Sequence, residues 1–540
     1  MQKKEAKYQF WVDTIAKEVV EREKRLKRGI KVIRTESGIG ASGIPHIGSM
    51  SDSVRSFAVK LGVEDLGKKS EYIAYSDSRD GLRKVPSGLP DWLEEHIGEP
   101  VTNIPDPFGD CHKSYGDHMS SLLIDALEKA DLKFTFISGA EAYKKGLLNE
   151  QIQKILSNAD KLGDIVRKHT GQEKYTEVLP YFPLCENCKK IYTTRAYKLL
   201  AGEHKVAYKC DAEFKGQNKN NNKEILIKGC GHEGEASYFD GDGKLSWKGE
   251  FAARWDALKI CFEAFGKDIA DSVRVNDAIC KEILGFEPPV HIMYEMFLDK
   301  GGKKISKSVG NVFTPQVWMN YGTPESLVLL MLKRFEGTRE LDVSDIPRYM
   351  DEVNKLMLTY FGKEKVENER DLINMKRLFA YINFLKPPKN QKLHIPYSVM
   401  VEVAKVLPER NQVEFAVGKL KESGHIKKSG KSDEKYIEML LNFAKNWVED
   451  FERTEAKEVQ LSKGEKTAIM ELIDMIRVED RPEILQEKIF GIGNKHKIKS
   501  KRFFQILYNI LLKSDRGPRL GAYIHQVGKA EIISKLKDFV

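Results

Sequence analysis

A glycine-rich loop between a short apolar run and a helical pattern is the feature that most constrains the fold of this chain. The loop, Gly38-Ile39-Gly40-Ala41-Ser42-Gly43, matches the pattern G-x-G-x-x-G and follows the strand-like run 31–34. Apolar residues then recur at helical spacing from Val54 to Leu61. A strand, a glycine loop and a helix in this order are typical of nucleotide-binding α/β folds, in which the start of the helix attracts a phosphate. The sequence therefore predicts a parallel α/β sheet that binds a nucleotide.

The residues after the loop favour an adenosine mononucleotide over NAD. Pro45 suits the start of a helix, where His46 would face whatever the loop holds. A dinucleotide site also needs an acidic residue about 20 positions on, to bind a ribose hydroxyl. An acidic residue near that spacing is not found until Glu64 and Asp65. An NAD-linked oxidoreductase is therefore kept only as an alternative.

The order of apolar patterns along the chain predicts several domains. Strand-like runs at 31–34, 72–75, 134–137 and 290–293 alternate with helical patterns, which predicts an α/β domain over residues 1–345. From 346 to 540 the apolar residues recur every three to four positions, so this part is expected to be entirely helical. A chain of 540 residues is long enough for such a division.

Composition excludes a membrane-spanning protein and says little about partners. The longest relevant apolar run, 327–332, is far shorter than the roughly 20 residues that cross a bilayer. The N-terminus carries charges of both signs and has no apolar signal-peptide core, so we expect a cytoplasmic protein. Lys and Arg outnumber Asp and Glu by 89 to 80, and a net charge of +9 is only a weak indication of a polyanionic partner.

Four of the seven cysteines form a pattern typical of a zinc site. Cys185 and Cys188 make a C-x-x-C after an aromatic-proline turn, and Cys210 and Cys230 follow. In a reducing compartment such spacing predicts tetrahedral thiolate ligation of zinc, with His232 as the alternative fourth ligand. This segment, about 170–245, interrupts the α/β alternation and is predicted to be an insertion. The polar stretch 216–223 within it is expected to be a loop.

A second candidate metal site lies nearer the N-terminus. Its ligands would be Asp106, Cys111, His112 and His118, a carboxylate, a thiolate and two imidazoles, which suit zinc. Adjacent Cys and His residues are not a standard zinc knuckle, so one zinc ion is expected at the cysteines and a second only if this set binds. Four protein ligands leave no position for a water molecule, which predicts structural rather than catalytic metals.

A lysine-rich turn near residue 305 is the second candidate phosphate site. The turn reads Gly301-Gly302-Lys303-Lys304-Ile305-Ser306-Lys307-Ser308. Lys304 and Lys307 are spaced so that both can face one polyphosphate.

Together, Pro45-His46-Ile47-Gly48 and Lys304-Ile305-Ser306-Lys307-Ser308 resemble the HIGH and KMSKS signatures of class I aminoacyl-tRNA synthetases. Within that class the resemblance is closest to the class I lysyl-tRNA synthetases of archaea and some bacteria, and it covers nearly the whole chain. The run Asp80-Gly81-Leu82-Arg83-Lys84-Val85-Pro86 is its most specific part. The chain departs from HIGH at its last position, where Ser49 replaces histidine.

The resemblance implies a Rossmann-like catalytic domain with a zinc-bearing insertion and a helical anticodon-binding domain over 346–540. It also implies a two-step reaction, in which ATP with Mg²⁺ converts lysine to lysyl-adenylate and the lysyl group then passes to the 3′-terminal adenosine of tRNA(Lys). A monomer is favoured. The alternatives are a class I synthetase for glutamate or cysteine, and a zinc-ribbon RNA-binding protein with a vestigial nucleotide site.

The same resemblance implies roles for individual residues. The expected ATP contacts are Gly43, His46, Gly48, Ser49, Lys304, Ser306 and Lys307, of which His46, Lys304 and Lys307 would be catalytic because they stabilise phosphate charge. The ε-ammonium and methylenes of lysine need a carboxylate and an aromatic wall. Glu36 is the expected carboxylate, and Trp255 and Tyr294 are the expected wall.

Overall fold

The structure is a computed structural model that describes residues 9–298, 313–334, 336–452, 460–512, 514–515 and 517–540. It divides into two compact units. The first contains Met1–Met319, Thr323–Asp345 and Thr359–Pro387, and the second contains Asn320–Gly322, Ile346–Leu358 and Pro388–Val540. Residues 359–387, expected in the helical domain, thus pack with the first unit. The predicted domain limits stay predictions.

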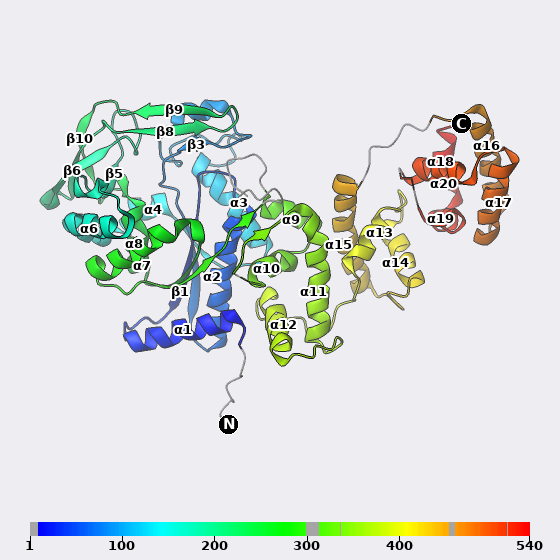
Figure 1. The fold of residues 1–540 in the computed structure, drawn as a ribbon, viewed down its shortest axis with the longest axis horizontal. Helices are drawn as coiled ribbons and strands as arrows, with labels where there is room; N and C mark the ends of the chain where they lie inside the picture. Colours follow the sequence, from blue (N-terminus) through cyan, green and yellow to red (C-terminus); the bar gives the residue numbers. More distant parts are fainter. Residues whose placement is uncertain (1–8, 299–312, 335, 453–459, 513, 516) are drawn as a thin grey trace, which may run out of the picture. The chain divides into compact units, whose positions relative to one another are not determined.

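A five-stranded sheet in the order β13-β12-β1-β2-β4 forms the centre of the first unit, and all its neighbouring strands are parallel (Figure 1). The predicted α/β class is thereby confirmed, and each of the four expected runs overlaps a strand. The inner strand β12, which lies between β13 and β1, was not predicted. The strands are β1 (Ile33–Ile39), β2 (Ser70–Ser76), β4 (Thr135–Ser138), β12 (Ile260–Gly266) and β13 (Val290–Tyr294).

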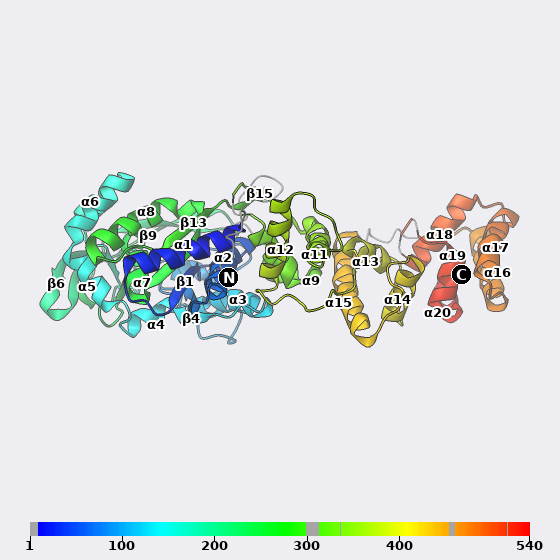
Figure 2. The same ribbon diagram turned by 90° about the horizontal axis from the view of Figure 1, so that it is seen from below.

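Helices cover both faces of this sheet, so its inner strands are buried, as is usual for parallel sheets. Helix α2 (Ile47–Asp65) packs on β1, β2 and β12, and α7 (Trp247–Leu258) packs on β12 from the opposite side (Figures 1 and 2). The other helices of this unit are α1 (Trp11–Leu26), α3 (Tyr115–Lys129), α4 (Gly139–Lys144), α5 (Asn149–Ser157), α6 (Ala159–Thr170), α8 (Ala270–Ile279), α9 (Pro315–Tyr321), α10 (Pro324–Leu332) and α12 (Glu369–Ile382).

The part of the chain between α6 and α7 folds into small sheets. Its strands are β5 (Tyr181–Pro183), β6 (Arg195–Leu200), β7 (Lys205–Lys209), β8 (Glu213–Asn218), β9 (Lys223–Lys228), β10 (Glu233–Ser237) and β11 (Gly243–Leu245). Strands β8 and β9 form a hairpin that pairs with β3 (Lys84–Val85). Of the loop expected over 216–223, residues 219–222 form the turn of this hairpin, whereas 216–218 and 223 belong to its strands. Two asparagines of this stretch make hydrogen bonds to residues outside the hairpin. Asn218 donates to Asp91 at 2.7 Å, and Asn220 donates to the Leu89 carbonyl at 2.8 Å.

Within the described part of residues 346–540, every regular element is a helix, as expected. These helices are α11 (Ile346–Tyr360), α13 (Tyr397–Ala404), α14 (Gln412–Glu422), α15 (Lys431–Trp447), α16 (Lys463–Val478), α17 (Pro482–Lys495), α18 (Ser500–Leu512), α19 (Leu520–Val527) and α20 (Lys529–Lys537). None of the helices among the described residues is both long and apolar enough to cross a membrane.

Candidate active site

His46 and Gly48 define the start of α2. His46 is the N-cap residue, with extended backbone (φ −101°, ψ 172°), and the chain turns helical at Ile47. A Cβ atom on residue 48 would lie 2.7 Å from His46 Cε1 and 2.8 Å from its Nδ1. Glycine at this position is therefore what lets the imidazole lie against the first helical turn. The arrangement leaves a histidine beside helix N–H groups that favour an anion.

A pocket of about 230 Å³ opens at this helix start, along the carboxyl ends of the strands. Gly38 belongs to the end of β1, Asp77 follows β2, Asp268 follows β12 and Tyr294 ends β13. In open parallel sheets this edge is where ligands bind, because loops from separate strands converge there. The pocket thus combines a helix N-terminus, suited to phosphate, with carboxylates suited to a cation.

The predicted site residues divide into three groups. His46, Gly48, Ser49 and Tyr294 line the pocket. Gly43, Glu36 and Trp255 are not among its lining residues, and both Glu36 and Trp255 are fully buried. Lys304, Ser306 and Lys307 lie outside the described residues.

Beneath the pocket, one buried guanidinium contacts three carboxyl groups. Arg254 Nε lies 2.9 Å from Glu36 Oε1, its Nη1 lies 2.9 Å from Asp77 Oδ1, and its Nη2 lies 3.6 Å from Glu263 Oε1. Burial raises the pKa of Glu36 and Glu263, and it raises the pKa of Asp77 to about 7, although Arg254 opposes each shift. Three carboxyls around one cation leave an excess of negative charge that protons or another cation must balance.

The two predicted aromatic residues have different positions. Trp255 donates its indole N–H to Glu263 Oε2 at 2.5 Å, so it supports the charge cluster from inside the core. Tyr294 faces the pocket, donates its hydroxyl hydrogen to Asp52, and has the Arg55 guanidinium 4.2 Å from its ring centroid. Only Tyr294 is placed to touch a ligand.

Sequence reasoning missed three carboxylates of this pocket, Asp52, Asp77 and Asp268. Asp77 comes directly after β2 and Asp268 is the second residue after β12, and acidic residues at the carboxyl ends of parallel strands were a signal available for them. Asp52 lies on α2, five residues after Ile47, and its spacing gave no such signal.

The four predicted cysteines meet with a geometry that fits zinc. The ligand atoms of Cys185, Cys188, Cys210 and Cys230 all lie within 4.8 Å of one another, and His232 is not in the group. The Sγ atoms of Cys185 and Cys230 are 3.7 Å apart, and those of Cys188 and Cys210 are 3.6 Å apart. Tetrahedral zinc with Zn–S bonds of about 2.3 Å requires sulfur atoms about 3.8 Å apart.

The second predicted set also gathers its donor atoms at one point. His118 Nδ1 lies 3.0 Å from Asp106 Oδ2 and 3.1 Å from His112 Nδ1. Cys111 Sγ lies 3.2 Å from Asp106 Oδ2 and from His112 Nδ1. All four ligand atoms lie within 4.8 Å of one another. These spacings are close to those of a tetrahedral N/O/S zinc site, so the donor set fits the metal.

Comparison with known proteins agrees with this geometry. Residues 9–380 match the family described as class I tRNA synthetases (K). A lysine–tRNA ligase of Cenarchaeum symbiosum is 46% identical over 530 residues, which are 98% of this chain and 98% of the relative. A lysine–tRNA ligase of Rickettsia bellii (strain OSU 85-389) is 31% identical over 511 residues, covering 93% of this chain and 92% of the relative. The chain belongs to the family of class I lysyl-tRNA synthetases.

Proposed function

We propose that the pocket at the start of α2 is where this lysine–tRNA ligase joins lysine to AMP before the lysyl group passes to tRNA(Lys). The single observation that carries the proposal is a pocket that has a helix N-terminus on one side and, at Asp77, reaches a buried cluster with a surplus of carboxyls. The helix end suits the triphosphate of ATP, and the carboxyls suit the ammonium groups of lysine.

On the ATP side, we assign binding to His46, Gly48 and Ser49, with Gly43 shaping the loop before them. His46 donates a hydrogen bond to the phosphates as charge moves onto the leaving pyrophosphate, and the helix amides reinforce it. Mg²⁺ would accompany ATP and would be held mainly by phosphate oxygens. Lys304, Ser306 and Lys307 are assigned to the pyrophosphate by their sequence motif alone.

On the lysine side, we assign the ε-ammonium to Asp77 and the methylenes to Tyr294. Asp77 keeps 12% of its side chain exposed, whereas the Glu36 side chain is 0% exposed. Glu36 and Trp255 therefore support the site indirectly, Glu36 through Arg254 and Trp255 through Glu263. A substrate ammonium supplies the positive charge that the Arg254 cluster lacks.

We also propose structural zinc at both donor sets. At Cys185, Cys188, Cys210 and Cys230 the metal would cross-link the insertion. At Asp106, Cys111, His112 and His118 it would fix the segment that leads into α3, whose Tyr115 donates to the Ser42 carbonyl of the glycine loop at 3.0 Å. The metal would thereby hold one side of the nucleotide loop in place.

The helical part of residues 346–540 is assigned to the anticodon of tRNA(Lys), because the family resemblance gives it that role. Charging of a tRNA(Lys) transcript with radiolabelled lysine tests the proposed function. The wild type is expected to form lysyl-tRNA, and His46→Ala to form it at least about 100-fold more slowly while keeping the wild-type circular dichroism spectrum. Failure of the wild type to charge this tRNA with lysine would contradict the proposal.

A further inference from the structure

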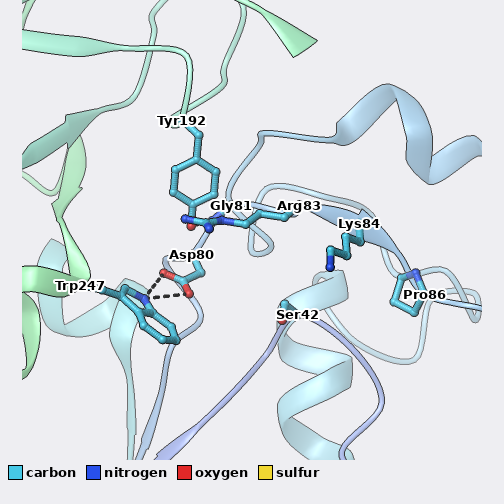
Figure 3. Close-up of a pocket in the computed structure, with 8 residues that line it drawn as sticks. All are labelled: Ser42, Asp80, Gly81, Arg83, Lys84, Pro86, Tyr192 and Trp247. Carbon is cyan, nitrogen blue, oxygen red and sulfur yellow. Dashed lines mark hydrogen bonds between the residues drawn. The ribbon is translucent and has the colours of Figure 1, made fainter. Parts of the chain in front are cut away.

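A tryptophan and a tyrosine line the pocket at the start of α2, and a carboxylate accepts a hydrogen bond from each. The indole N–H of Trp247 donates to Asp80, whose two carboxylate oxygens lie 3.3 and 3.4 Å from the nitrogen, as Figure 3 shows. The hydroxyl group of Tyr294 donates to Asp52 on α2. A bond at the hydroxyl leaves a tyrosine ring free to turn about its long axis, so the orientation of the ring plane must come from another contact.

That contact comes from a buried arginine on α2. The guanidinium carbon of Arg55 lies over the Tyr294 ring, 4.2 Å from its centroid, and the Arg55 side chain is 0% exposed. Arg55 and Asp52 are three residues apart on the helix, so they lie on the same face of it. The helix thus holds the tyrosine at two points, with Asp52 at the hydroxyl and Arg55 at the ring face.

The Arg55 guanidinium is itself anchored. Its Nη1 donates to the Ser51 hydroxyl and, at 3.3 Å, to the Ser51 carbonyl, and its Nη2 donates to the Arg334 carbonyl at 3.5 Å. Arg334 follows α10, and carbonyl groups near the end of a helix attract cations. Burial lowers the pKa of Arg55 to about 10, although Tyr294 and Asp52 oppose the shift, so the side chain stays charged at neutral pH.

Arg55 is placed to act on a ligand only through a neighbour. It has no exposed surface, and of the residues that it contacts, Ser51, Arg334 and Tyr294, only Tyr294 lines the pocket. Dispersion contacts between an aromatic ring and methylene groups weaken steeply when a small gap opens between them. A ring that is free to turn would therefore be a poorer wall for an aliphatic chain.

We propose that Arg55 is a positioning residue for the amino acid: it sets the plane of the Tyr294 ring, and so places the wall for the lysine methylenes without touching the substrate. The inference rests on the proposed function, which assigns the methylenes to Tyr294. It leaves the ATP contacts at the start of α2 unchanged. Loss of Arg55 should therefore weaken the binding of lysine and not that of ATP.

Steady-state charging of tRNA(Lys) tests this, because it gives separate KM values for lysine and for ATP. Arg55→Met keeps a long side chain and removes the planar cation. It is expected to raise the KM for lysine about tenfold and to leave the KM for ATP and the kcat within about twofold of the wild type. A merely structural role would instead reduce the amount of active enzyme, and hence the apparent kcat, with both KM values unchanged.

The variant Tyr294→Leu shows whether the effect passes through the ring. Alone, it should raise the KM for lysine. In the Tyr294→Leu background, Arg55→Met should raise that KM no further, because two residues that act through one contact do not give additive effects. A further rise of about tenfold in the double variant would overturn the inference.

The matched control is Arg377→Met, which removes an arginine that contacts the far end of the same helix. Arg377 Nη2 lies 3.0 Å from Asp65 Oδ2 and 2.5 Å from Asp13 Oδ1. This variant should lose stability and keep both KM values.

The variant Arg55→Lys covers the case in which Arg55→Met does not fold, because lysine keeps the buried charge but lacks the planar group. It should still raise the KM for lysine, although less than Arg55→Met does. An unchanged KM for lysine in the folded Arg55 variant would overturn the inference.

Failure of this inference is distinguishable from failure of the proposed function. If Tyr294→Leu leaves the KM for lysine unchanged, the proposed lysine site is wrong. If Tyr294→Leu raises that KM and Arg55→Met does not, only the role of Arg55 has been misassigned.

Discussion

Arg254 Nη1 lies 2.9 Å from Asp77 Oδ1, and this contact joins α7 to the end of β2 at the floor of the candidate active site. The same guanidinium contacts Glu36 and Glu263, so a single buried arginine holds three carboxyl groups from three neighbouring strands or strand ends. Of these carboxyl groups, Asp77 lines the pocket, whereas the Glu36 side chain is fully buried beneath it.

Removal of this arginine should destabilise the first unit strongly. Arg254→Met leaves buried carboxyls without their cation, which typically costs about 3–5 kcal/mol in the free energy of unfolding. Urea unfolding followed by tryptophan fluorescence measures the change. The exposed Arg195–Asp211 pair is the control, and Arg195→Met should cost less than about 1 kcal/mol. Equal costs for the two variants would contradict the role of the cluster.

Lysine binding should depend on pH through Asp77. Burial raises the pKa of this carboxyl to about 7, so it is mostly protonated and neutral below that pH and charged above it. The ε-ammonium of lysine stays charged throughout this range. The KM for lysine should therefore fall as pH rises through about 7.

Asp77→Asn is the variant that identifies the titrating group. It should raise the KM for lysine about tenfold or more, because a hydrogen bond to a charged group is lost, and should flatten the pH profile. Steady-state charging at several lysine concentrations and pH values measures both effects. A variant profile with the wild-type slope would assign the titration to another group.

The Gly48→Ala substitution should impair tRNA charging without unfolding the protein. The new methyl group would meet the His46 ring at 2.7 Å and displace the imidazole from the helix start. Alanine suits a helix better than glycine does, so stability should change by no more than about 1 kcal/mol. Charging is expected to fall as far as it does in His46→Ala.

Gly464→Ala is the matched control, because Gly464 is also the second residue of its helix and an added Cβ there meets nothing within 4 Å. It should keep wild-type charging. Wild-type activity in Gly48→Ala would show that the position of the His46 ring does not matter.

Metal content should follow the two donor sets separately. Cys185→Ala should lose the zinc of the cysteine cluster, and His118→Ala should lose that of the other set, each leaving the second metal in place. Elemental analysis of the purified variants measures this. Cys261→Ala is the control, since Cys261 is buried but belongs to neither set. Wild-type zinc content in Cys185→Ala would rule out zinc at the cysteines.

Site residues that form a local pattern could be predicted from the sequence. Site residues that come together from distant parts of the chain could not. His46 and Gly48 lie in one short segment after a predicted strand. The four cysteines of the predicted zinc site were recognisable from their spacing in the sequence. By contrast, Asp77 and Asp268 meet only because β2 and β12 lie in one sheet with β1 between them. Nothing in a single sequence gives that order of strands.

Strand β12 was missed for a related physical reason. It is buried along its whole length, so its residues show no alternation of polar and apolar side chains. It also follows α7 after a single residue, Lys259, whose left-handed φ of 55° turns the chain. Because α7 is itself buried on most sides, the two elements read as one apolar stretch.

The most direct test of the central claim is ATP–pyrophosphate exchange in the presence of tRNA(Lys), with lysine, glutamate and cysteine supplied in turn. The pairing of excess buried carboxyls with a helix start suited to phosphate predicts exchange with lysine alone, and a KM for lysine about tenfold higher in Asp77→Asn. Exchange supported by glutamate or cysteine, or none with lysine, would contradict the assignment of this pocket.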